Sequence, residues 1–556
     1  MEVDADGIVA MDDVHQQGDR HDSEREHKPA SLVGTDVYSA KHLSPRLFES
    51  HSRQRRSPNN SKRMAAARLT ISWRTAASPA LAGLAVIVAH LPSFLHRLLD
   101  GDEAIYSSIA VLMNLGGGLY GPGGVDNKPP GIFWVYALTF RLFGAYQMDA
   151  IHAVGFVAMA ATCLVVFAIA RHLAGTRAGI LAGLFYGLLT AAGNPRLLAS
   201  NTEIFMMMPL AASVLLLLRK QWFWTGLLLV AAGAFRQSAA VNVLLVALAI
   251  FWLEPAEGRR HAALGFGGGL LAGLLAGAVL IVLTGSLEGF WRWTVQTLVG
   301  YASASWTPGF VWSRARDSIV PFVVDMSVLW IAAVALIARW RDLSVEVRLM
   351  VAWLVVAMAG SLAGGHLSWH YFIQAMGPLA VLAALAFDRF EMRRFVATAA
   401  VAGIAIPAVF WWAFDIGADP LTYDFNAPGP QHETVSAYIA ANTSPSQRVF
   451  VWGDWPALYV ESNRVMAGRF PGFLRGFERG SDVPPNNWDT APDVWTLLQS
   501  DLAANPPALI VDTAAAGWSD FASYPMSNYP VLAELVADHY HKVATIDGVV
   551  IYARNG

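Results

Sequence analysis

The sequence predicts an all-helical polytopic membrane protein that ends in a small α/β domain, and three features of the chain support this fold class. Hydrophobic residues make up 55% of the 556 residues and charged residues only 15%, whereas a soluble globular protein carries about 25% charged residues. Apolar runs recur between residues 76 and 414, and the 20 Trp residues suit the aromatic belts of membrane interfaces. Residues 415–556 have a water-soluble composition instead.

About eleven of the apolar runs are predicted to cross the membrane, because several of them approach the ~20 residues that a bilayer requires. Residues 131–147 form a shorter run that carries Arg141, so we expect an interfacial helix in the first outer loop there. The predicted spans cover residues 76–96, 150–170, 179–194, 203–218, 222–235, 238–253, 263–284, 320–338, 349–363, 371–387 and 395–414.

The basic residues of the short loops predict the orientation of the spans. If the N-terminus lies in the cytoplasm, the loops that are rich in Arg and Lys all fall inside, for example 171–177 and 389–394. The loops near 97–149 and 285–319 then fall outside, and so does the C-terminal tail. Reading 131–147 as a span would invert every later loop and break this pattern.

The two ends of the chain differ from the membrane domain, which we place at residues 64–414. Residues 1–63 are polar, charged and aperiodic, so we expect a disordered extension there, with Met64 as an alternative start of translation. Residues 415–556 are predicted to be an extracytoplasmic α/β domain. Its expected strands are RVFVWG, ALIVDT and GVVIYAR, and its expected helices are ETVSAYIAAN and VLAELVADHY.

Charge and cysteine content exclude several classes of function. The net charge of −3 is too small to suggest nucleic acid as a partner. The chain has one cysteine, Cys163, which excludes a disulfide within the chain and a cysteine-based metal site. Because Cys163 stands inside an apolar run, we expect it to be a packing residue.

The first outer loop contains the residues best suited to chemistry. Asp102 and Glu103 follow the first predicted span directly, and an acid at an outer membrane edge can act as a general base on an incoming hydroxyl. The alternative is a pair of solvated loop acids. Lys128 precedes Pro129 and Pro130, which fix it near the N-terminus of the next helix. An ammonium group there favours an anion such as phosphate, although a lysine that snorkels at the interface is the alternative.

The first outer loop carries the motif D-G-D-E-A-x-Y at residues 100–106, a Gly-rich turn, and K-P-P before an aromatic helix. With these features it resembles the first outer loop of C-type membrane glycosyltransferases (GT-C). The similar branch is the protein mannosyltransferase and aminoarabinose transferase type, which is like glycosyltransferase family 39. The resemblance covers about residues 80–260 and is looser up to residue 415. It implies a GT-C fold, a polyprenyl- or dolichyl-phosphate sugar as donor, and inverting transfer to a lipid, glycan or protein acceptor outside the cytoplasm.

The resemblance also implies roles for single residues. Asp102 matches the essential loop acid of the family, and Glu103 is the second acid of the same pair. Lys128 matches a lysine that faces the lipid phosphate. Glu203 matches an acid in the second outer loop.

The chemistry of inverting transfer suits these residue types. One base must take the proton of the acceptor, and we expect Asp102 in this role. The departing phosphate needs cations, for which we expect Lys128 together with Arg236 and Arg196. Arg236 lies between two apolar runs, at the outer end in this topology, where an interfacial anchor is the alternative.

The remaining candidates are assigned to the acceptor and sugar site: Glu203, Tyr106, His366 and His370. His366 and His370 are four residues apart and would share one face of a helix, as metal ligands can. No third ligand is evident in the sequence. Some relatives carry a metal-ligating acid directly before K-P-P, where this chain has Asn127. We therefore expect no metal or other cofactor, with a divalent metal as the unsupported alternative.

A transporter or flippase of lipid-linked sugars is the main alternative to an enzyme. Such a protein should place ionisable residues or broken helices near the membrane midplane. Here the charged residues collect in loops at one face, which favours surface chemistry. An inactive assembly subunit is a third possibility, against which the intact D-E and K-P-P motifs argue. The alanine-rich chain suggests a bacterial inner membrane, and the sequence identifies neither the sugar nor the acceptor.

Overall fold

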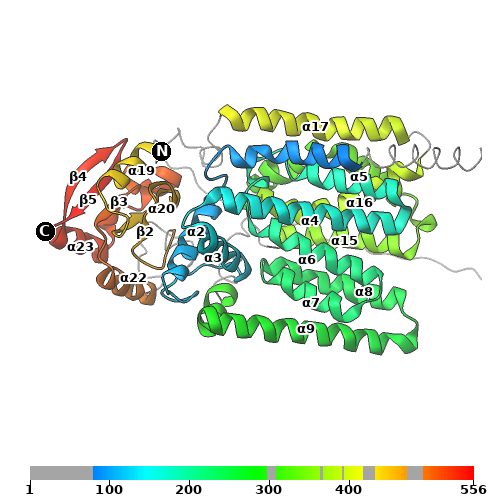
Figure 1. The fold of residues 1–556 in the computed structure, drawn as a ribbon, viewed down its shortest axis with the longest axis horizontal. Coiled ribbons are helices and arrows are strands. Elements are labelled where there is room, and N and C mark those ends of the chain that lie inside the picture. Colours follow the sequence, from blue (N-terminus) through cyan, green and yellow to red (C-terminus); the bar gives the residue numbers. More distant parts are fainter. Residues whose placement is uncertain (1–78, 297–307, 364–366, 391–392, 418–431, 473–491) are drawn as a thin grey trace, which may run out of the picture. The chain divides into compact units, whose positions relative to one another are not determined.

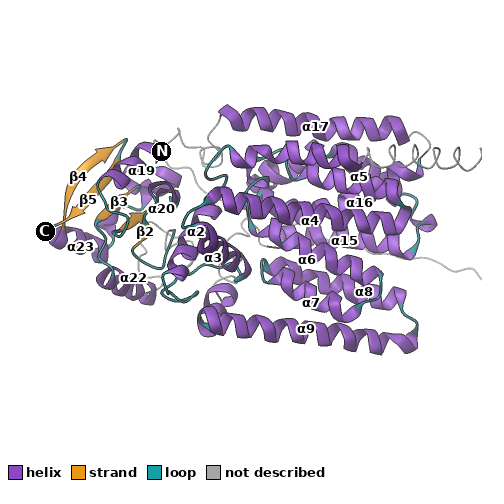
Figure 2. Cartoon of the chain, in the orientation of Figure 1, coloured by secondary structure: helices purple, strands orange, loops and turns teal. Residues whose placement is uncertain are grey.

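The computed structural model describes residues 79–296, 308–363, 367–390, 393–417, 432–472 and 492–556. All of them fall within one compact unit, Arg68–Gly556. The described chain is mostly helical (Figure 1), and Figure 2 shows that its strands gather in one small sheet. The prediction of a helical protein with a small C-terminal sheet is therefore confirmed.

The longer apolar helices form a bundle, in which α4, α5, α6, α9, α16 and α17 run nearly parallel in Figure 1. The bundle begins with an apolar helix at Pro79–Phe94. Its other helices are α4 (Met148–Ala174), α5 (Thr176–Leu189), α6 (Thr202–Leu218), α7 (Trp222–Gly233), α8 (Val243–Leu253), α9 (Ala256–Thr284), α14 (Ser327–Ile337), α15 (Val345–Leu362), α16 (Ile373–Arg389) and α17 (Arg393–Gly417).

Four of the described helices are long and apolar enough to cross a membrane, or five if one bent pair counts as a single span. The four are Met148–Ala174, Ala256–Thr284, Val345–Leu362 and Trp369–Arg389. The other apolar helices of the described residues are shorter, so the structure does not establish the predicted number of eleven spans. Helix α3 (Gly131–Phe143) has 13 residues, fewer than the ~20 that a span needs.

One predicted span differs clearly from the structure. Residues 320–338 are predicted to form one straight span, but they belong to two helical segments, Val311–Asp325 and Ser327–Ile337, which meet at an angle of 74°. Met326 stands at the break with φ −104° and ψ 17°, outside the helical region. Hydropathy alone does not reveal such a bend, because residues 320–324 and 327–337 on the two sides of it are all apolar or weakly polar.

Small residues allow close packing inside the bundle. A side chain at Gly269 of α9 would lie 1.9 Å from the carbonyl oxygen of Phe223 in α7, and Gly226 of α7 meets the backbone of α9 in the same way. Such glycines let two helices approach more closely than larger residues allow. The span Trp369–Arg389, which includes α16, is buried over its whole apolar window and forms the centre of the bundle.

Short elements connect the bundle helices, and some of them carry the candidate site. They are η1 (Leu91–Phe94), α2 (Gly101–Asn114), η2 (Pro195–Leu197), η3 (Gln237–Asn242), α10 (Leu287–Phe290), η4 (Trp291–Gln296), α12 (Pro308–Arg314), η5 (Ala315–Ile319), α13 (Val320–Asp325), η6 (Trp340–Asp342) and η7 (Trp369–Phe372). A second apolar core, separate from that of the bundle, joins α2 and α3 to the C-terminal domain.

The C-terminal sheet has the strand order β2-β1-β3-β5-β4. Its strands are β1 (Arg448–Trp452), β2 (Val465–Met466), β3 (Leu509–Asp512), β4 (Tyr540–Ile546) and β5 (Val549–Arg554). The helices of the domain are α19 (His432–Ala441), α20 (Ala457–Ser462), α22 (Pro492–Ala504) and α23 (Pro530–His539). The domain also has the 3-10 turns η9 (Ala514–Ala516), η10 (Trp518–Ser523) and η11 (Met526–Asn528). Strands β2 and β3 pair with β1 in parallel, whereas β5 pairs with β3 and β4 with β5 in antiparallel fashion. The three expected strands correspond to β1, β3 and β5. The short β2 and the largely exposed β4 were not expected from the sequence.

Candidate active site

The N-terminus of α2 gathers acidic side chains. Asp100 is the N-cap residue, and its carboxylate accepts a hydrogen bond from the backbone N–H of Asp102 at 3.3 Å. Acids are favourable at this position because the helix dipole and the free N–H groups attract negative charge. One turn further, the hydroxyl of Tyr106 donates to Oδ2 of Asp102 at 3.1 Å. The side chain of Asp102 is a quarter exposed and thus accessible to a substrate.

Lys128 approaches this turn from the loop before α3. Its Nζ lies 3.8 Å from Oδ2 of Asp102 and 3.8 Å from Oδ1 of Asp126. The backbone N–H of Lys128 donates to Oδ1 of Asp126 at 2.8 Å, and its carbonyl oxygen accepts from the hydroxyl of Tyr120 at 2.8 Å. The structure therefore brings Asp102 and Lys128 together and holds the lysine at its backbone.

Both members of this pair carry their charge at neutral pH. Burial raises the pKa of Asp102, but Lys128, His370 and Arg196 together outweigh burial and lower the pKa to about 2. Burial also lowers the pKa of Lys128, and here Asp102 and Asp126 more than compensate, so that the pKa of the ammonium rises above its usual value. The site thus holds a carboxylate and an ammonium group side by side.

Asp100 lies at the centre of the same cluster, although the sequence did not single it out. Its Oδ2 accepts a hydrogen bond from Nδ2 of Asn201 at 2.7 Å and lies 3.6 Å from Nδ1 of His370. Its Oδ1 lies 3.7 Å from Nε of Arg196. Burial raises the pKa of Asp100 more than Arg196 lowers it. The signal in the sequence was its place as the first residue of the D-G-D-E-A-x-Y motif, two residues before Asp102.

A buried ion pair joins Glu203 to Arg236 next to this cluster. Nη1 of Arg236 also donates to the hydroxyl of Thr202 at 3.3 Å, and the guanidinium lies 3.7 Å from the ring centre of Tyr371. Oε1 of Glu203 lies 4.0 Å from Nε2 of His370, whose other nitrogen faces Asp100. Arg236, which the sequence assigned to the phosphate, is therefore engaged by an acid and by an aromatic ring.

Most of the predicted site residues converge in three dimensions. His366 lies outside the described residues. The predicted residues that the structure brings into one connected cluster are Asp102, Tyr106, Lys128, Arg196, Glu203, Arg236 and His370, and the cluster includes Asp100 and Asp126 as well.

Comparisons with known proteins show what the chain is similar to. Residues 127–284 match the family model of dolichyl-phosphate-mannose-protein mannosyltransferase. The crystal structure of ArnT from Cupriavidus metallidurans bound to undecaprenyl phosphate is similar with a TM-score of 0.57 and 13% identity, over 85% of this chain and 96% of ArnT. The Archaeoglobus fulgidus oligosaccharyltransferase tethered to an acceptor peptide is similar with a TM-score of 0.50 and 12% identity, over 86% of this chain and 74% of that protein. No curated protein matches the sequence significantly.

The chain has the GT-C fold. The resemblance to mannosyltransferase- and ArnT-type membrane glycosyltransferases that the outer-loop motif indicated is thereby confirmed. The family match includes Lys128 and the K-P-P motif, and it ends at Thr284, the last residue of α9. The structural similarity extends over 85% of the chain, whereas the sequence resemblance covers about residues 80–260 and is looser up to residue 415.

Within this GT-C fold, Glu103 lies in a different environment from Asp102. Its side chain is fully buried, and its two oxygens accept hydrogen bonds from the backbone N–H groups of Leu99 at 2.8 Å and Ser200 at 2.7 Å. Nε2 of His152 lies 3.2 Å from Oε1 of Glu103. Both oxygens of the carboxylate are therefore occupied by neighbouring segments, whereas the sequence assigned Glu103 to catalysis.

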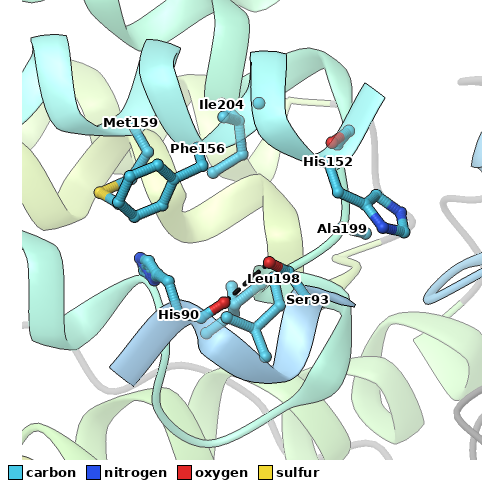
Figure 3. A pocket seen from close by; sticks show the side chains of 11 residues that line it. His90, Ser93, His152, Phe156, Met159, Leu198, Ala199 and Ile204 are labelled. Carbon is cyan, nitrogen blue, oxygen red and sulfur yellow. Dashed lines mark hydrogen bonds between the residues drawn. The ribbon is translucent and has the colours of Figure 1, made fainter. Parts of the chain in front are cut away.

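A small cavity is lined by His152 and neighbouring residues (Figure 3). Its volume is about 20 Å³, enough for about one water molecule. His90 and Phe156 meet edge to face across it, with ring centres 6.0 Å apart. The hydroxyl of Ser93 donates to the carbonyl oxygen of His90 at 2.7 Å. The cavity is too small for a sugar or a prenyl chain, so it is not a substrate site.

Three side chains of the site have the geometry of a possible cation site. Ligand atoms of Asp100, Asp102 and His370 all lie within 4.8 Å of one another. Two carboxylates and an imidazole suit several divalent metals. The sequence had paired His370 with His366 and had found no third ligand, so this grouping was not foreseen. However, Lys128 and Arg196 face the same two carboxylates and compete with a metal for them.

Proposed function

We propose that the chain is a membrane glycosyltransferase that moves a sugar from a polyprenyl-phosphate donor to an acceptor hydroxyl outside the cytoplasm, with inversion. The observation that carries this proposal is the ion pair of Asp102 and Lys128 in a protein with the GT-C fold. The similar ArnT structure was determined with undecaprenyl phosphate bound, which supports a lipid phosphate as the donor carrier. The proposal is independent of which sugar, which acceptor and which prenyl chain length the enzyme uses.

Asp102 is the proposed base of the reaction. Its carboxylate would take the proton of the acceptor hydroxyl while the acceptor oxygen forms a bond to the anomeric carbon of the sugar. The bond from that carbon to the phosphate oxygen breaks on the opposite side, and the polyprenyl phosphate leaves with the electron pair. Tyr106 orients the base through its hydrogen bond to Oδ2.

Lys128 is the proposed partner of the donor phosphate, supported by Arg196. Without donor, the ammonium group faces Asp102 and keeps the pKa of this carboxylate low. A phosphate that pairs with Lys128 would partly neutralise this charge, and the proton affinity of Asp102 would then rise. The base would thereby become stronger when the donor is in place.

The other residues of the cluster receive supporting roles in this proposal. Glu203, Tyr106 and His370 belong to the same cluster as Asp102, and we assign them to sugar or acceptor hydroxyls. His366 keeps its assignment from the sequence. Arg236 would contact the phosphate only by sharing its charge between Glu203 and the donor. We reassign Glu103 from catalysis to positioning, because both of its oxygens hold the backbone.

We also propose the arrangement of the chain in the membrane. About eleven spans within residues 64–414 would place the cluster of Asp102 and Lys128 on the extracytoplasmic face, with residues 415–556 on the same side. A bacterial inner membrane suits the composition. This orientation rests on the distribution of Arg and Lys in the loops, and it is consistent with the contacts between α2 and the C-terminal domain.

Transport of a lipid-linked sugar is the alternative activity. The described site argues against it, because the acids and cations lie in α2, in the loop before α3 and at the ends of bundle helices. A transporter would need such groups along a path through the bilayer. Chemistry at one face requires only the cluster that is present.

The proposal is tested by comparing cells that produce the wild-type protein with cells that produce the Asp102→Asn variant. Mass spectrometry of envelope lipids, glycans and glycoproteins should find a sugar modification only with the wild type. The purified wild-type protein in vesicles should then release polyprenyl phosphate from the matching donor. Movement of the intact donor across the vesicle membrane without release of polyprenyl phosphate would contradict the proposal and favour a flippase.

A further inference from the structure

We propose that the C-terminal domain positions the loop that carries Lys128, and that it does so through the ion pair of Arg469 with Asp501. The inference rests on the proposed function, because that function gives Lys128 a donor phosphate to bind. Its structural part rests on contacts between α22, the segment after β2 and the outer loop. Neither the family match nor the outer-loop motif includes any residue of this domain.

One carboxylate fixes both the side chain and the backbone of Arg469. Oδ2 of Asp501 accepts from Nε of Arg469 at 2.8 Å and from its backbone N–H at 2.9 Å, and Oδ1 accepts from Nη2 at 2.7 Å. Both side chains are nearly buried, with 13% and 11% exposed. Two-pronged, charge-assisted bonds of this kind are stronger and more directional than single ones. The backbone N–H and the side chain of Arg469 are therefore both held by α22.

The residue held in this way contacts the loop of Lys128. The carbonyl oxygen of Arg469 accepts a hydrogen bond from the backbone N–H of Val125 at 3.1 Å. Val125 is fully buried, and the next residue, Asp126, accepts from the backbone N–H of Lys128 at 2.8 Å. A chain of hydrogen bonds thus runs from Asp501 to the backbone of Lys128.

The residue after Arg469 reaches the same loop by a second route. Phe470 is buried, and its ring lies 6.1 Å from that of Trp293 in η4. The carbonyl oxygen of Thr294 accepts from Nε2 of Gln237 at 3.3 Å, and the same amide group donates to the carbonyl oxygen of Asn127 at 2.7 Å. The two neighbours of Asp126, Val125 and Asn127, are therefore both connected to the segment after β2. Val125 contacts it directly, and Asn127 is connected to it through Gln237 and η4.

The loop needs such support because its own structure is glycine-rich. Gly117 and Gly123 approach each other so closely that a side chain at Gly117 would lie 2.5 Å from the Cα of Gly123. Gly124 adopts a φ of +116°, which other residues rarely accept. Tyr120 and Asp126 of the loop hold the backbone of Lys128, but the glycines have no side chains that could fix the position of the loop itself. An error of about 1 Å in the position of a charged group can reduce catalysis about 100-fold.

Other contacts hold the domain in place without Arg469. Nη2 of Arg97 donates to Oδ1 of Asn463 at 2.5 Å, and the hydroxyl of Tyr146 donates to the carbonyl oxygen of Arg464 at 3.0 Å. Breaking the ion pair of Arg469 should therefore loosen the loop without releasing the domain. This separation makes the proposal testable by substitution.

The test compares Asp501→Asn with Asp512→Asn in full-length protein in nanodiscs. Asp512 is a buried acid of β3 whose Oδ1 accepts from the backbone N–H of Ala514, so it controls for the loss of a carboxylate within the domain. Hydrogen exchange followed by mass spectrometry reports on the peptide that contains Val125. Binding of undecaprenyl phosphate, measured by native mass spectrometry, reports on the donor site. Arg469→Lys serves as a second variant if Asp501→Asn does not fold.

We expect Asp501→Asn to speed exchange in the peptide that contains Val125 and to weaken binding of undecaprenyl phosphate about tenfold. Asp512→Asn should change neither. Lys128→Ala should weaken binding of undecaprenyl phosphate. If it does, the inference is overturned when Asp501→Asn leaves hydrogen exchange of the Val125 peptide unchanged. It is also overturned when exchange is faster but binding of undecaprenyl phosphate is unchanged. If Lys128→Ala also leaves binding unchanged, the proposed function fails, and the positioning role fails with it.

Discussion

The ammonium group of Lys128 lies 3.8 Å from a carboxylate oxygen of Asp102, in a site where Tyr106 donates a hydrogen bond to the same oxygen. This contact sets the proton affinity of the proposed base, since Lys128 is the strongest of the groups that lower the pKa of Asp102 to about 2. A base held at so low a pKa accepts a proton readily only after the opposing charge has been neutralised. The donor phosphate would supply that neutralisation.

Asp102→Asn should abolish transfer and leave the fold intact. The substitution keeps the shape of the side chain but removes the group that takes the proton, and loss of a general base costs about 10²- to 10⁴-fold in rate. The rate of polyprenyl phosphate release by purified protein measures this effect, and circular dichroism with a melting curve serves as the control for folding. Retention of more than a tenth of the activity would remove Asp102 from the role of base.

Lys128→Met should move the acid limb of the pH–rate profile to higher pH. The lysine is the largest influence that lowers the pKa of Asp102, whereas burial raises it. Without Lys128 the pKa of Asp102 rises, so the carboxylate form that accepts the proton is lost at a higher pH as the solution is acidified. Profiles of kcat/KM in the wild type and the variant measure the shift. An acid limb at the same pH in both would show that Lys128 does not tune the base.

The convergence of Asp102 with Lys128 was predictable from the outer-loop motif, but the roles of their neighbours were not. Asp102 and Glu103 are adjacent in the first turn of α2. Adjacent helical residues point about 100° apart and do not face each other. They therefore could not both face one substrate, although the motif presents them as a pair. The position of Asp100 before α2 likewise predicts only a helix cap. Its contacts with Asn201 and His370 join segments that are far apart in the sequence, so the sequence does not reveal them.

The bundle shows a similar division between what the sequence predicts and what it does not. Apolar runs correctly indicated where helices such as α4 and α9 lie. The bend at Met326 and the burial of α16 on all sides depend on how helices pack, and hydropathy carries no information about that. His370 is an example at the site. Its nearest sequence partner was His366, but its partners in space are Asp100, the N-cap residue of α2, and Glu203 of α6.

Glu103→Gln should lower stability more than the rate of the folded enzyme. A glutamine side chain has one acceptor oxygen, so it cannot accept from both Leu99 and Ser200. A buried backbone N–H group without a partner costs about 1–3 kcal/mol. The melting temperature in detergent should fall, while kcat per folded molecule should decrease far less than in Asp102→Asn. A variant with wild-type melting temperature and no activity would restore Glu103 to the catalytic residues.

Treatment with EDTA should leave transfer unchanged. Asp100, Asp102 and His370 are close enough together to hold a divalent cation. However, Nζ of Lys128 lies 3.8 Å from Asp102 and Nε of Arg196 lies 3.7 Å from Asp100, so cations of the chain itself already balance both carboxylates. A metal would have to displace these groups and would add positive charge beside them. Transfer that EDTA abolishes and Mn²⁺ restores would contradict this expectation, and His370→Ala should then prevent the restoration.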